Sequence, residues 1–165
     1  MPSINANGVT LEYERFGQTN DPAILLIMGL GAQLTLWPVE LVEALVGHGF
    51  QVIRYDNRDI GLSTKFDTAG LPDLAAVTMA VLSGRKPDLA HTLEDMAGDA
   101  AALLDALEVA QAHIVGDTMG GLIAQLVAAH HPQKDLDHVD HRHSDAAARQ
   151  PRGDGGADGA SAIGR

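Results

Sequence analysis

The feature that most constrains this chain is a five-residue turn, Gly116-Asp117-Thr118-Met119-Gly120, between a short apolar run and an amphipathic segment. The run before the turn contains Ile114 and Val115, and its length favours a buried strand. The segment after the turn has apolar residues at helical spacing: Leu122, Ile123, Leu126 and Val127. Glycines at both ends of the turn allow the strand and the helix to pass close to each other. The pattern predicts a sheet with helices packed against it, and it places Thr118 in the sharp turn between them.

Length and charge exclude several classes of protein. The chain has 165 residues, which is enough for one domain with a hydrophobic core, and a net charge of −11. That charge argues against nucleic acid or an anionic membrane as a partner. There is no cysteine, no signal-peptide pattern, and no apolar run near the roughly 20 residues that span a membrane. We expect a soluble cytoplasmic protein with no cofactor and no structural metal.

Strands and helices are expected to alternate along residues 1–132, which favours an α/β fold with a mostly parallel sheet. Thr92 and Asp95 have the spacing of a capping box at a helix start. Residues 67–86 are less regular, and they form either a helical connection or part of a lid. The expected strands are Ser3–Asn5, Thr10–Phe16, Ala23–Met28, Gln51–Tyr55 and His113–Val115, and the expected helices are Pro38–Val46, Thr92–Leu107 and the segment after Thr118.

Two loops upstream of the turn carry further short motifs. Met28-Gly29-Leu30-Gly31 follows a buried run, and residues 55–63 have the sequence Tyr-Asp-Asn-Arg-Asp-Ile-Gly-Leu-Ser. Together with Gly-Asp-Thr-Met-Gly, these motifs resemble the α/β-hydrolase superfamily, and within it the small esterases similar to aclacinomycin methylesterase. They correspond to the oxyanion loop, the Asp-x-Arg-Gly-x-Gly-x-Ser loop and the nucleophile elbow. Met28 stands where His is commoner, Asp59 where Gly is common, and Thr118 where Ser is usual.

The resemblance implies the N-terminal part of an α/β-hydrolase fold over residues 1–132, incomplete at its C-terminal side. It implies hydrolysis of a carboxylic ester, such as a methyl ester or a lactone, by nucleophilic acyl transfer on a small-molecule substrate. Thr118 takes the nucleophile position, and the backbone N–H groups of Met119 and Leu30 stabilise the oxyanion. The resemblance also assigns a structural role to the glycines of the oxyanion loop and of the elbow: Gly29, Gly31, Gly116, Gly120 and Gly121.

The acid and the histidine of a catalytic triad follow the nucleophile in this fold, so both are expected after Thr118. His130 and His131 are expected to end the helix after the turn. Three further histidines lie near residue 140 with acidic residues between them: His138, His141 and His143. They could supply a surrogate base, bind Zn²⁺ or Ni²⁺ loosely, or belong to a solvated tail. Thr118 is either a weak nucleophile or the remnant of a serine site. Asp56 and Arg58 are expected to brace their loop.

Beyond residue 132 the composition changes, and we expect residues 133–165 to be a disordered tail foreign to the family, as from a shifted reading frame. The large aliphatic residues there are Leu136, Val139 and Ile163. No strand is then available beside His113–Val115, so that strand has an exposed edge and the following helix has an uncovered face. We therefore expect weak or lost activity and a homodimer through this edge or helix. The alternative function is a non-catalytic, self-associating fragment.

Overall fold

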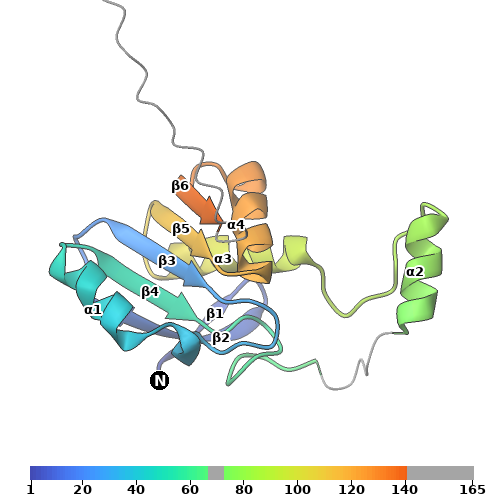
Figure 1. The fold of residues 1–165 in the computed structure, drawn as a ribbon, viewed down its shortest axis with the longest axis horizontal. Coiled ribbons are helices and arrows are strands. Elements are labelled where there is room, and N and C mark those ends of the chain that lie inside the picture. Colours follow the sequence, from blue (N-terminus) through green and yellow to red (C-terminus); the bar gives the residue numbers. More distant parts are fainter. Residues whose placement is uncertain (67–72, 141–165) are drawn as a thin grey trace, which may run out of the picture.

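The computed structural model describes residues 1–66 and 73–140, which form a six-stranded sheet with helices on both faces (Figure 1). The strand order across the sheet is β1-β2-β4-β3-β5-β6. The strands are β1 Ser3–Ala6, β2 Val9–Phe16, β3 Ala23–Ile27, β4 Gln51–Tyr55, β5 Ala112–Gly116 and β6 Asp135–Asp140. The helices are the 3-10 turn η1 Leu34–Leu36 and the α-helices α1 Val39–Gly47, α2 Leu74–Leu82, α3 Leu93–Ala106 and α4 Met119–His130.

The sheet is antiparallel at its N-terminal side and parallel elsewhere. β1 and β2 form a hairpin, and β2 also pairs antiparallel with β4. β3 lies between β4 and β5, parallel to both, and β5 pairs in parallel with β6. Every residue of β3 is buried, as expected for an apolar run covered on both faces. The strands expected within residues 1–132 are confirmed, as is the mostly parallel α/β fold.

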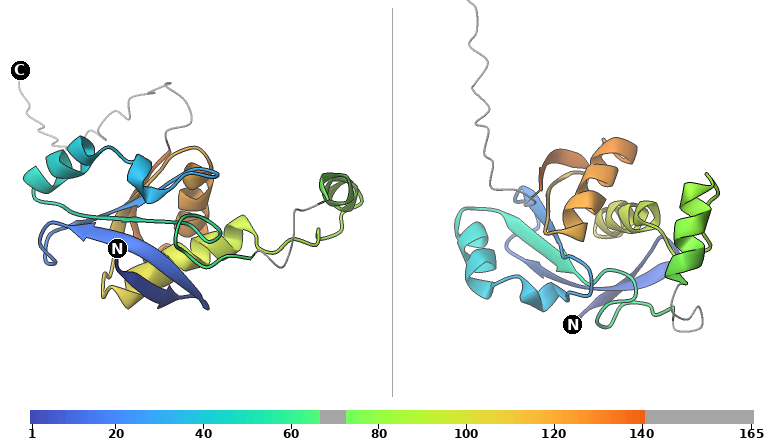
Figure 2. Two further views of the ribbon diagram at one scale, coloured as in Figure 1. Left: turned by 90° about the horizontal axis from the view of Figure 1, so that it is seen from below. Right: turned by 45° about the vertical axis from the view of Figure 1, so that its right-hand side comes forward.

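Alternate residues of the central strands face two separate cores. Figure 2 shows α1 on one face of the sheet and α3 and α4 on the other. Leu25 and Ile27 belong to the larger core, which α3 and α4 cover. Ile24 and Leu26 belong to the smaller core, where Val42 of α1 packs against them. This alternation follows from the two-residue period of a strand. Because the helices cover the two faces of the sheet, the carboxyl ends of the parallel strands present their loops at one edge.

The start of α3 confirms the predicted capping box. The hydroxyl of Thr92 accepts a hydrogen bond from the Asp95 N–H at 3.2 Å, and the Asp95 carboxylate accepts from the Thr92 N–H at 2.8 Å. Each bond satisfies an N–H group that the first helical turn leaves without an intrahelical partner. The segment that enters α3 is thereby fixed, and this segment contributes to the candidate site below.

The absence of a strand after residue 132 was a wrong expectation. β6 lies beside β5 with Gly116 paired to Asp140, so the outer edge of β5 is covered. The expected uncovered face of α4 is wrong for Ile123 and Val127, which are fully buried in the larger core, whereas Leu122 and Leu126 are half-buried. Residues 141–165 lie outside the described residues, and the metal hypothesis with His141 and His143 lies there with them.

The irregular segment between β4 and α3 contains one described helix, α2. In Figures 1 and 2 it stands apart from the sheet, so it covers neither the sheet nor the turn after β5. Met79 and Leu82 on this helix are exposed. None of the helices within residues 1–66 and 73–140 combines the length and the apolar character needed to cross a membrane.

Candidate active site

Thr118 occupies a strained backbone position between β5 and α4. Its φ is 52° and its ψ is −111°, a region that residues with a branched Cβ rarely adopt. Holding such a conformation costs on the order of 1–3 kcal/mol, and strain of this size persists where the surrounding structure imposes it. The Thr118 side chain is exposed at the edge of the sheet. The turn therefore presents the hydroxyl outward at the point where the strand becomes a helix.

Close backbone contacts around Thr118 impose this conformation. A Cβ on Gly116 would overlap the backbone of Gly120, and a Cβ on Gly120 would overlap the carbonyl oxygen of Ile27. The Asp117 N–H donates to the same Ile27 carbonyl at 3.0 Å. Only residues without a side chain allow β5, α4 and the end of β3 to approach this closely.

The loop after β3 runs directly against Thr118. A Cβ on Gly29 would lie 3.1 Å from the Thr118 Cβ and 3.4 Å from its Oγ1. Leu30 follows with 80% of its surface exposed, and its N–H donates to no acceptor within the described part of the chain. Met119 is the first residue of α4, so its N–H has no partner inside the helix and lies at the positive end of the helix dipole. Leu30 thus directly follows the glycine that lies against Thr118, and Met119 directly follows Thr118 itself.

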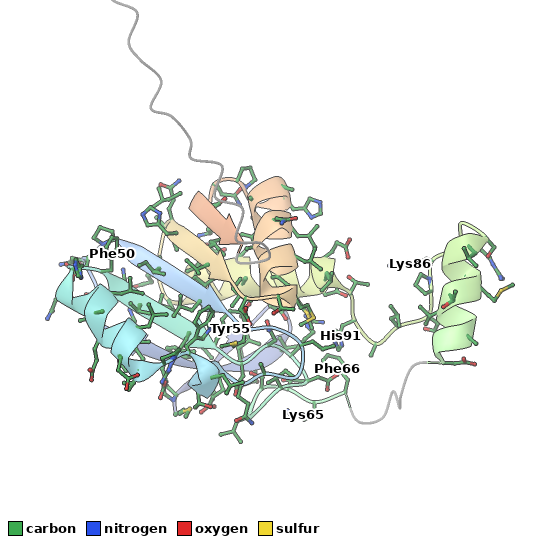
Figure 3. The ribbon with its side chains drawn as sticks, viewed as in Figure 1. Phe50, Tyr55, Lys65, Phe66, Lys86 and His91 are labelled. Atoms are coloured by element: carbon green, nitrogen blue, oxygen red, sulfur yellow. The ribbon has the colours of Figure 1, made fainter. Side chains whose placement is uncertain are left out.

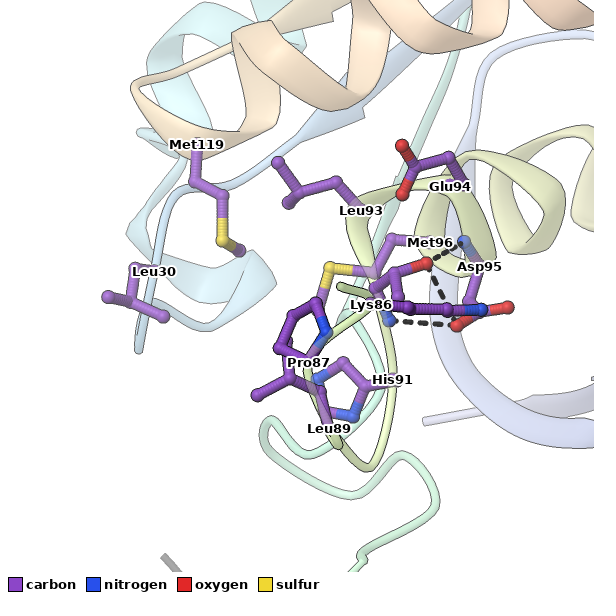
Figure 4. Close-up of a pocket in the computed structure, with 11 residues that line it drawn as sticks. Leu30, Lys86, Pro87, Leu89, His91, Leu93, Glu94, Asp95, Met96 and Met119 are labelled. Carbon is purple, nitrogen blue, oxygen red and sulfur yellow. Dashed lines mark hydrogen bonds between the residues drawn. The ribbon is translucent and has the colours of Figure 1, made fainter. Parts of the chain in front are cut away.

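A cavity of about 730 Å³ opens beside these groups (Figure 4). Leu30 and Met119 line one side of it, and the segment that enters α3 lines the other. Most of the lining is apolar, with further contributions from Leu89, Leu93 and Met96. The polar lining comes from Lys86, His91, Thr92, Glu94 and Asp95. The cavity thus combines an apolar floor with a few polar groups, as small-molecule sites commonly do.

His91 is the one histidine that lines this cavity, and sequence reasoning missed it. Its Nδ1 lies 3.7 Å from the Asp59 carboxylate, and its ring lies 5.4 Å from the ring of Phe66 (Figure 3). Asp59 has a φ of 69° and accepts a hydrogen bond from the Phe66 N–H at 2.7 Å. The histidine of a triad was expected after Thr118, so the sequence did not predict this pair. Its one signal in the sequence was a non-glycine residue where the related motif has glycine.

Arg58 braces the loop after β4, as expected, through a buried ion pair with α3. Its Nε and Nη2 donate to the Asp99 carboxylate at 2.7 and 2.6 Å, and Asn7 donates to the same carboxylate at 2.9 Å. The hydrogen bonds from Arg58 to Asp99 raise the pKa of the guanidinium above its ordinary value. Burial raises the pKa of the nearby Tyr55 hydroxyl as well, so Tyr55 stays neutral. The ion pair between Arg58 and Asp99 connects the loop after β4 to α3, the helix whose start lines the cavity.

The two histidines at the end of α4 lie far from the turn. His130 ends α4 and His131 follows it, as the sequence predicted. Twelve residues at 1.5 Å each separate that end from Thr118 by about 18 Å. Backbone pairing brings Asp140 beside Gly116, at the edge that carries the turn. No histidine or carboxylate among residues 1–66 and 73–136 hydrogen-bonds to the Thr118 Oγ1.

The fold and this strand–turn–helix motif are those of the alpha/beta hydrolase fold class. The model of the alpha/beta hydrolase fold family matches residues 22–138, six residues beyond the boundary expected at residue 132. The chain therefore belongs to the alpha/beta hydrolase fold family.

Curated relatives and solved structures support the same family. The chain is 37% identical over 136 residues to rhodomycin D methylesterase DauP of Streptomyces sp. strain C5, covering 81% of this chain and 40% of the relative. It is 30% identical to 3-oxoadipate enol-lactonase 2 of Acinetobacter baylyi, covering 80% and 41%. The crystal structure of the enol-lactonase from Burkholderia xenovorans LB400 superposes with a TM-score of 0.62 at 32% identity, covering 81% and 44%. The chain spans about two fifths of the length of the curated relatives that it matches.

Proposed function

We propose that this site hydrolyses carboxylic esters by acyl transfer, with Thr118 in the nucleophile position. The observation that carries the proposal is the positive φ of Thr118 at the junction of β5 and α4. A strained strand-to-helix turn is how an α/β-hydrolase exposes its nucleophile above the sheet. The Thr118 hydroxyl gives up its proton to a base and attacks the ester carbonyl, and the N–H groups of Leu30 and Met119 donate hydrogen bonds to the oxyanion of the tetrahedral intermediate. The alcohol takes up a proton and leaves as the intermediate collapses, and water then hydrolyses the acyl group from Thr118.

The cavity supports an ester with an apolar substituent. Leu30 and Met119 line it, so a carbonyl held between their N–H groups has the apolar side chains of the cavity next to it. The relatives named a methylesterase and an enol-lactonase are consistent with a methyl ester or a lactone as the substrate class. Burial of the apolar part of the substrate supplies about 25 cal/mol for each Å² that leaves water.

Threonine makes this a weak site. Its branched Cβ carries more strain at positive φ than serine does, and its methyl group crowds the attacking oxygen. A base must also lie within hydrogen-bond reach of the hydroxyl to activate it. We propose that the parent chain hydrolyses esters slowly because of the branched side chain and because of the need for a base, and that replacing the branched side chain raises the rate.

The test is hydrolysis of a p-nitrophenyl ester by the parent chain and by three variants. Thr118→Ser should raise kcat several-fold, and Thr118→Gly should reduce hydrolysis to background, because it removes the nucleophile without adding strain. Thr19→Ser, at an exposed loop position, is the matched control and should not change the rate. Equal background rates in the parent and in Thr118→Ser would contradict the proposed function.

A second candidate function, self-association without catalysis, depends on a different surface from the one first expected. β6 is the last strand of the sheet within the described residues, and its outer edge has no strand partner there. An open strand edge is a template for pairing with another chain. If the chain is such a homodimer, light scattering should show a mass that falls on dilution. A monomer of 17.3 kDa at every concentration would contradict it.

A further inference from the structure

We propose that Asp56 and Asn57 are positioning residues, which hold the loop Met28–Leu34 at both of its ends and thereby aim the N–H of Leu30. The proposal rests on the ester hydrolase function above, because it gives this N–H its role in oxyanion stabilisation. Both residues follow β4 directly, and both are almost completely buried, with 4% and 1% of their surfaces exposed. Neither touches the reacting atoms.

Asn57 holds the start of the loop. Its Nδ2 donates to the Met28 carbonyl at 3.0 Å, in a buried environment. A carbonyl only accepts hydrogen bonds, so the amide nitrogen of Asn57 has to face it. The Oδ1 of Asn57 is then buried with no partner in the described part of the chain, which costs about 1–3 kcal/mol. The side chain keeps this orientation because the contact with Met28 requires it.

Asp56 holds the end of the loop. Its Oδ1 accepts a hydrogen bond from the Leu34 N–H at 2.7 Å, which is a short bond between a carboxylate and the backbone. Its Oδ2 faces Leu62, and Gly61 lies so close to this oxygen that a Cβ there would overlap it. Gly61 has a φ of 52°. The carboxylate is therefore seated between two loops and has no room to turn away.

Between these two anchors, Gly29 packs against Thr118, and the loop has few other restraints within the described residues. The Ala32 N–H donates to the Gly29 carbonyl at 3.3 Å, and this is the one internal backbone hydrogen bond of residues 28–34. Leu30 is exposed, so packing does not fix its peptide plane. The direction of the Leu30 N–H depends on where the two anchors place the loop. Displacement of a catalytic group by about 1 Å reduces a rate about 100-fold.

The main test is Asn57→Asp, which keeps the shape of the side chain and replaces the donor with an oxygen that repels the Met28 carbonyl. Two quantities are measured on the 165-residue chain: the NMR signals of the loop, and kcat and KM for a p-nitrophenyl ester. The Leu30 amide should change its chemical shift, and hydrogen exchange of the Ala32 amide, which is hydrogen-bonded to Gly29, should accelerate at least 10-fold. The kcat should fall about 10- to 100-fold with KM within twofold of the parent value.

Asn20→Asp is the matched control, with the same change of charge at an exposed position before β3. It should leave the exchange rates and the kcat unchanged. Asn57→Leu removes the donor without introducing charge, and it provides the same comparison if Asn57→Asp does not fold. Asp56→Asn keeps an oxygen acceptor for Leu34, so its loss of kcat should be smaller than that of Asn57→Asp.

A parent-like chemical shift of Leu30 together with parent-like exchange of the Ala32 amide in both Asn57 variants would overturn the proposal. A KM that rises as much as kcat falls would also overturn it, because the residues would then serve substrate binding. The NMR measurements do not need catalysis. If neither the parent nor Thr118→Ser hydrolyses esters but the Leu30 shift and the Ala32 exchange respond as expected, the anchoring of the loop is supported and the proposed function is the part that fails.

Discussion

Two turns at the carboxyl edge of the sheet are built in opposite ways. The turn after β5 is shaped by missing side chains, since Gly116 and Gly120 lie where any Cβ would overlap neighbouring backbone. The loop after β4 is shaped by buried polar side chains, because Asp56, Asn57 and Arg58 each bond to a distant part of the chain. The first turn carries Thr118, and the second holds the loop opposite it.

The difference shows how each turn depends on the sequence. The β5 turn has a local contact between Gly116 and Gly120 and also packs against Ile27 and Gly29 at the end of β3, but the glycine spacing that permits both is visible within the turn itself. The β4 loop reaches partners 22 and 41 residues away, at Leu34 and Asp99. Its geometry therefore exists only after β3, β4 and α3 have packed together. We expect substitutions in the first turn to act through steric overlap with neighbouring backbone, and substitutions in the second to act through unpaired buried groups.

The largest effect is expected from Gly120→Ala. Its Cβ would overlap the Ile27 carbonyl, so β3 and α4 must separate at the centre of the sheet. We expect a loss of about 4 kcal/mol or more in the free energy of unfolding, measured by urea denaturation. Gly47→Ala is the control, because that position has open space and lies at the end of α1. A loss below about 1 kcal/mol for Gly120→Ala would mean that the close crossing is not required.

Arg58→Met tests the other turn, with an expected loss of about 3 kcal/mol. The substitution removes the positive charge beside the buried Asp99 carboxylate and leaves it with an uncharged hydrogen-bond donor, Asn7. The double variant Arg58→Met with Asp99→Leu should recover most of the loss, because no buried charge remains. Asp105→Ala breaks a pair whose acid is 68% exposed, and it should cost below about 1 kcal/mol. If Arg58→Met lowers the free energy of unfolding by no more than Asp105→Ala does, the β4 loop is not held by its ion pair.

The sequence predicted the local features of the fold correctly. The buried run Ala23–Met28, the hairpin at Asn7-Gly8 and the capping box at Thr92 each depend on a few adjacent residues. The sharp turn at Thr118 belongs to the same group. Such patterns work because periodicity, glycine positions and caps act over one or two turns of the chain.

Two features escaped sequence reasoning because their causes are not local. β6 pairs with β5 through backbone hydrogen bonds, which need no aliphatic side chains, whereas the argument against a strand rested on their scarcity. The approach of His91 to Asp59 joins segments 32 residues apart and depends on how α3 enters the core. Composition and spacing contain no direct information about either contact.

Thr118→Gly tests the strain in the β5 turn and should stabilise the chain by about 1 kcal/mol. Glycine adopts a φ of 52° without steric cost, whereas a branched Cβ does not. Thr19→Gly, at a position outside the positive-φ residues, should lose about 0.5–1 kcal/mol through the greater freedom of the unfolded chain. The two changes thus have opposite signs in the same urea experiment. Destabilisation by both would show that the Thr118 side chain contributes more through packing than it costs in strain.

The smallest effect concerns the cap of α3, beyond both turns but next to the cavity. Hydrogen bonds from the Thr92 N–H and hydroxyl lower the pKa of Asp95 below its ordinary value of 3.8. A carboxylate whose pKa is lower in the folded state stabilises the fold above its unfolded pKa, and this contribution is lost as the pH falls through the folded pKa. Asp95→Asn should therefore be less stable than the parent at pH 7, and the difference should shrink below about pH 4. Glu43→Gln, with the same loss of charge on α1, serves as the control in urea titrations from pH 7 to about 2.5. A difference that stays constant to the lowest pH would assign the cap to hydrogen-bond geometry alone, without a contribution from the charge of Asp95 at the helix start.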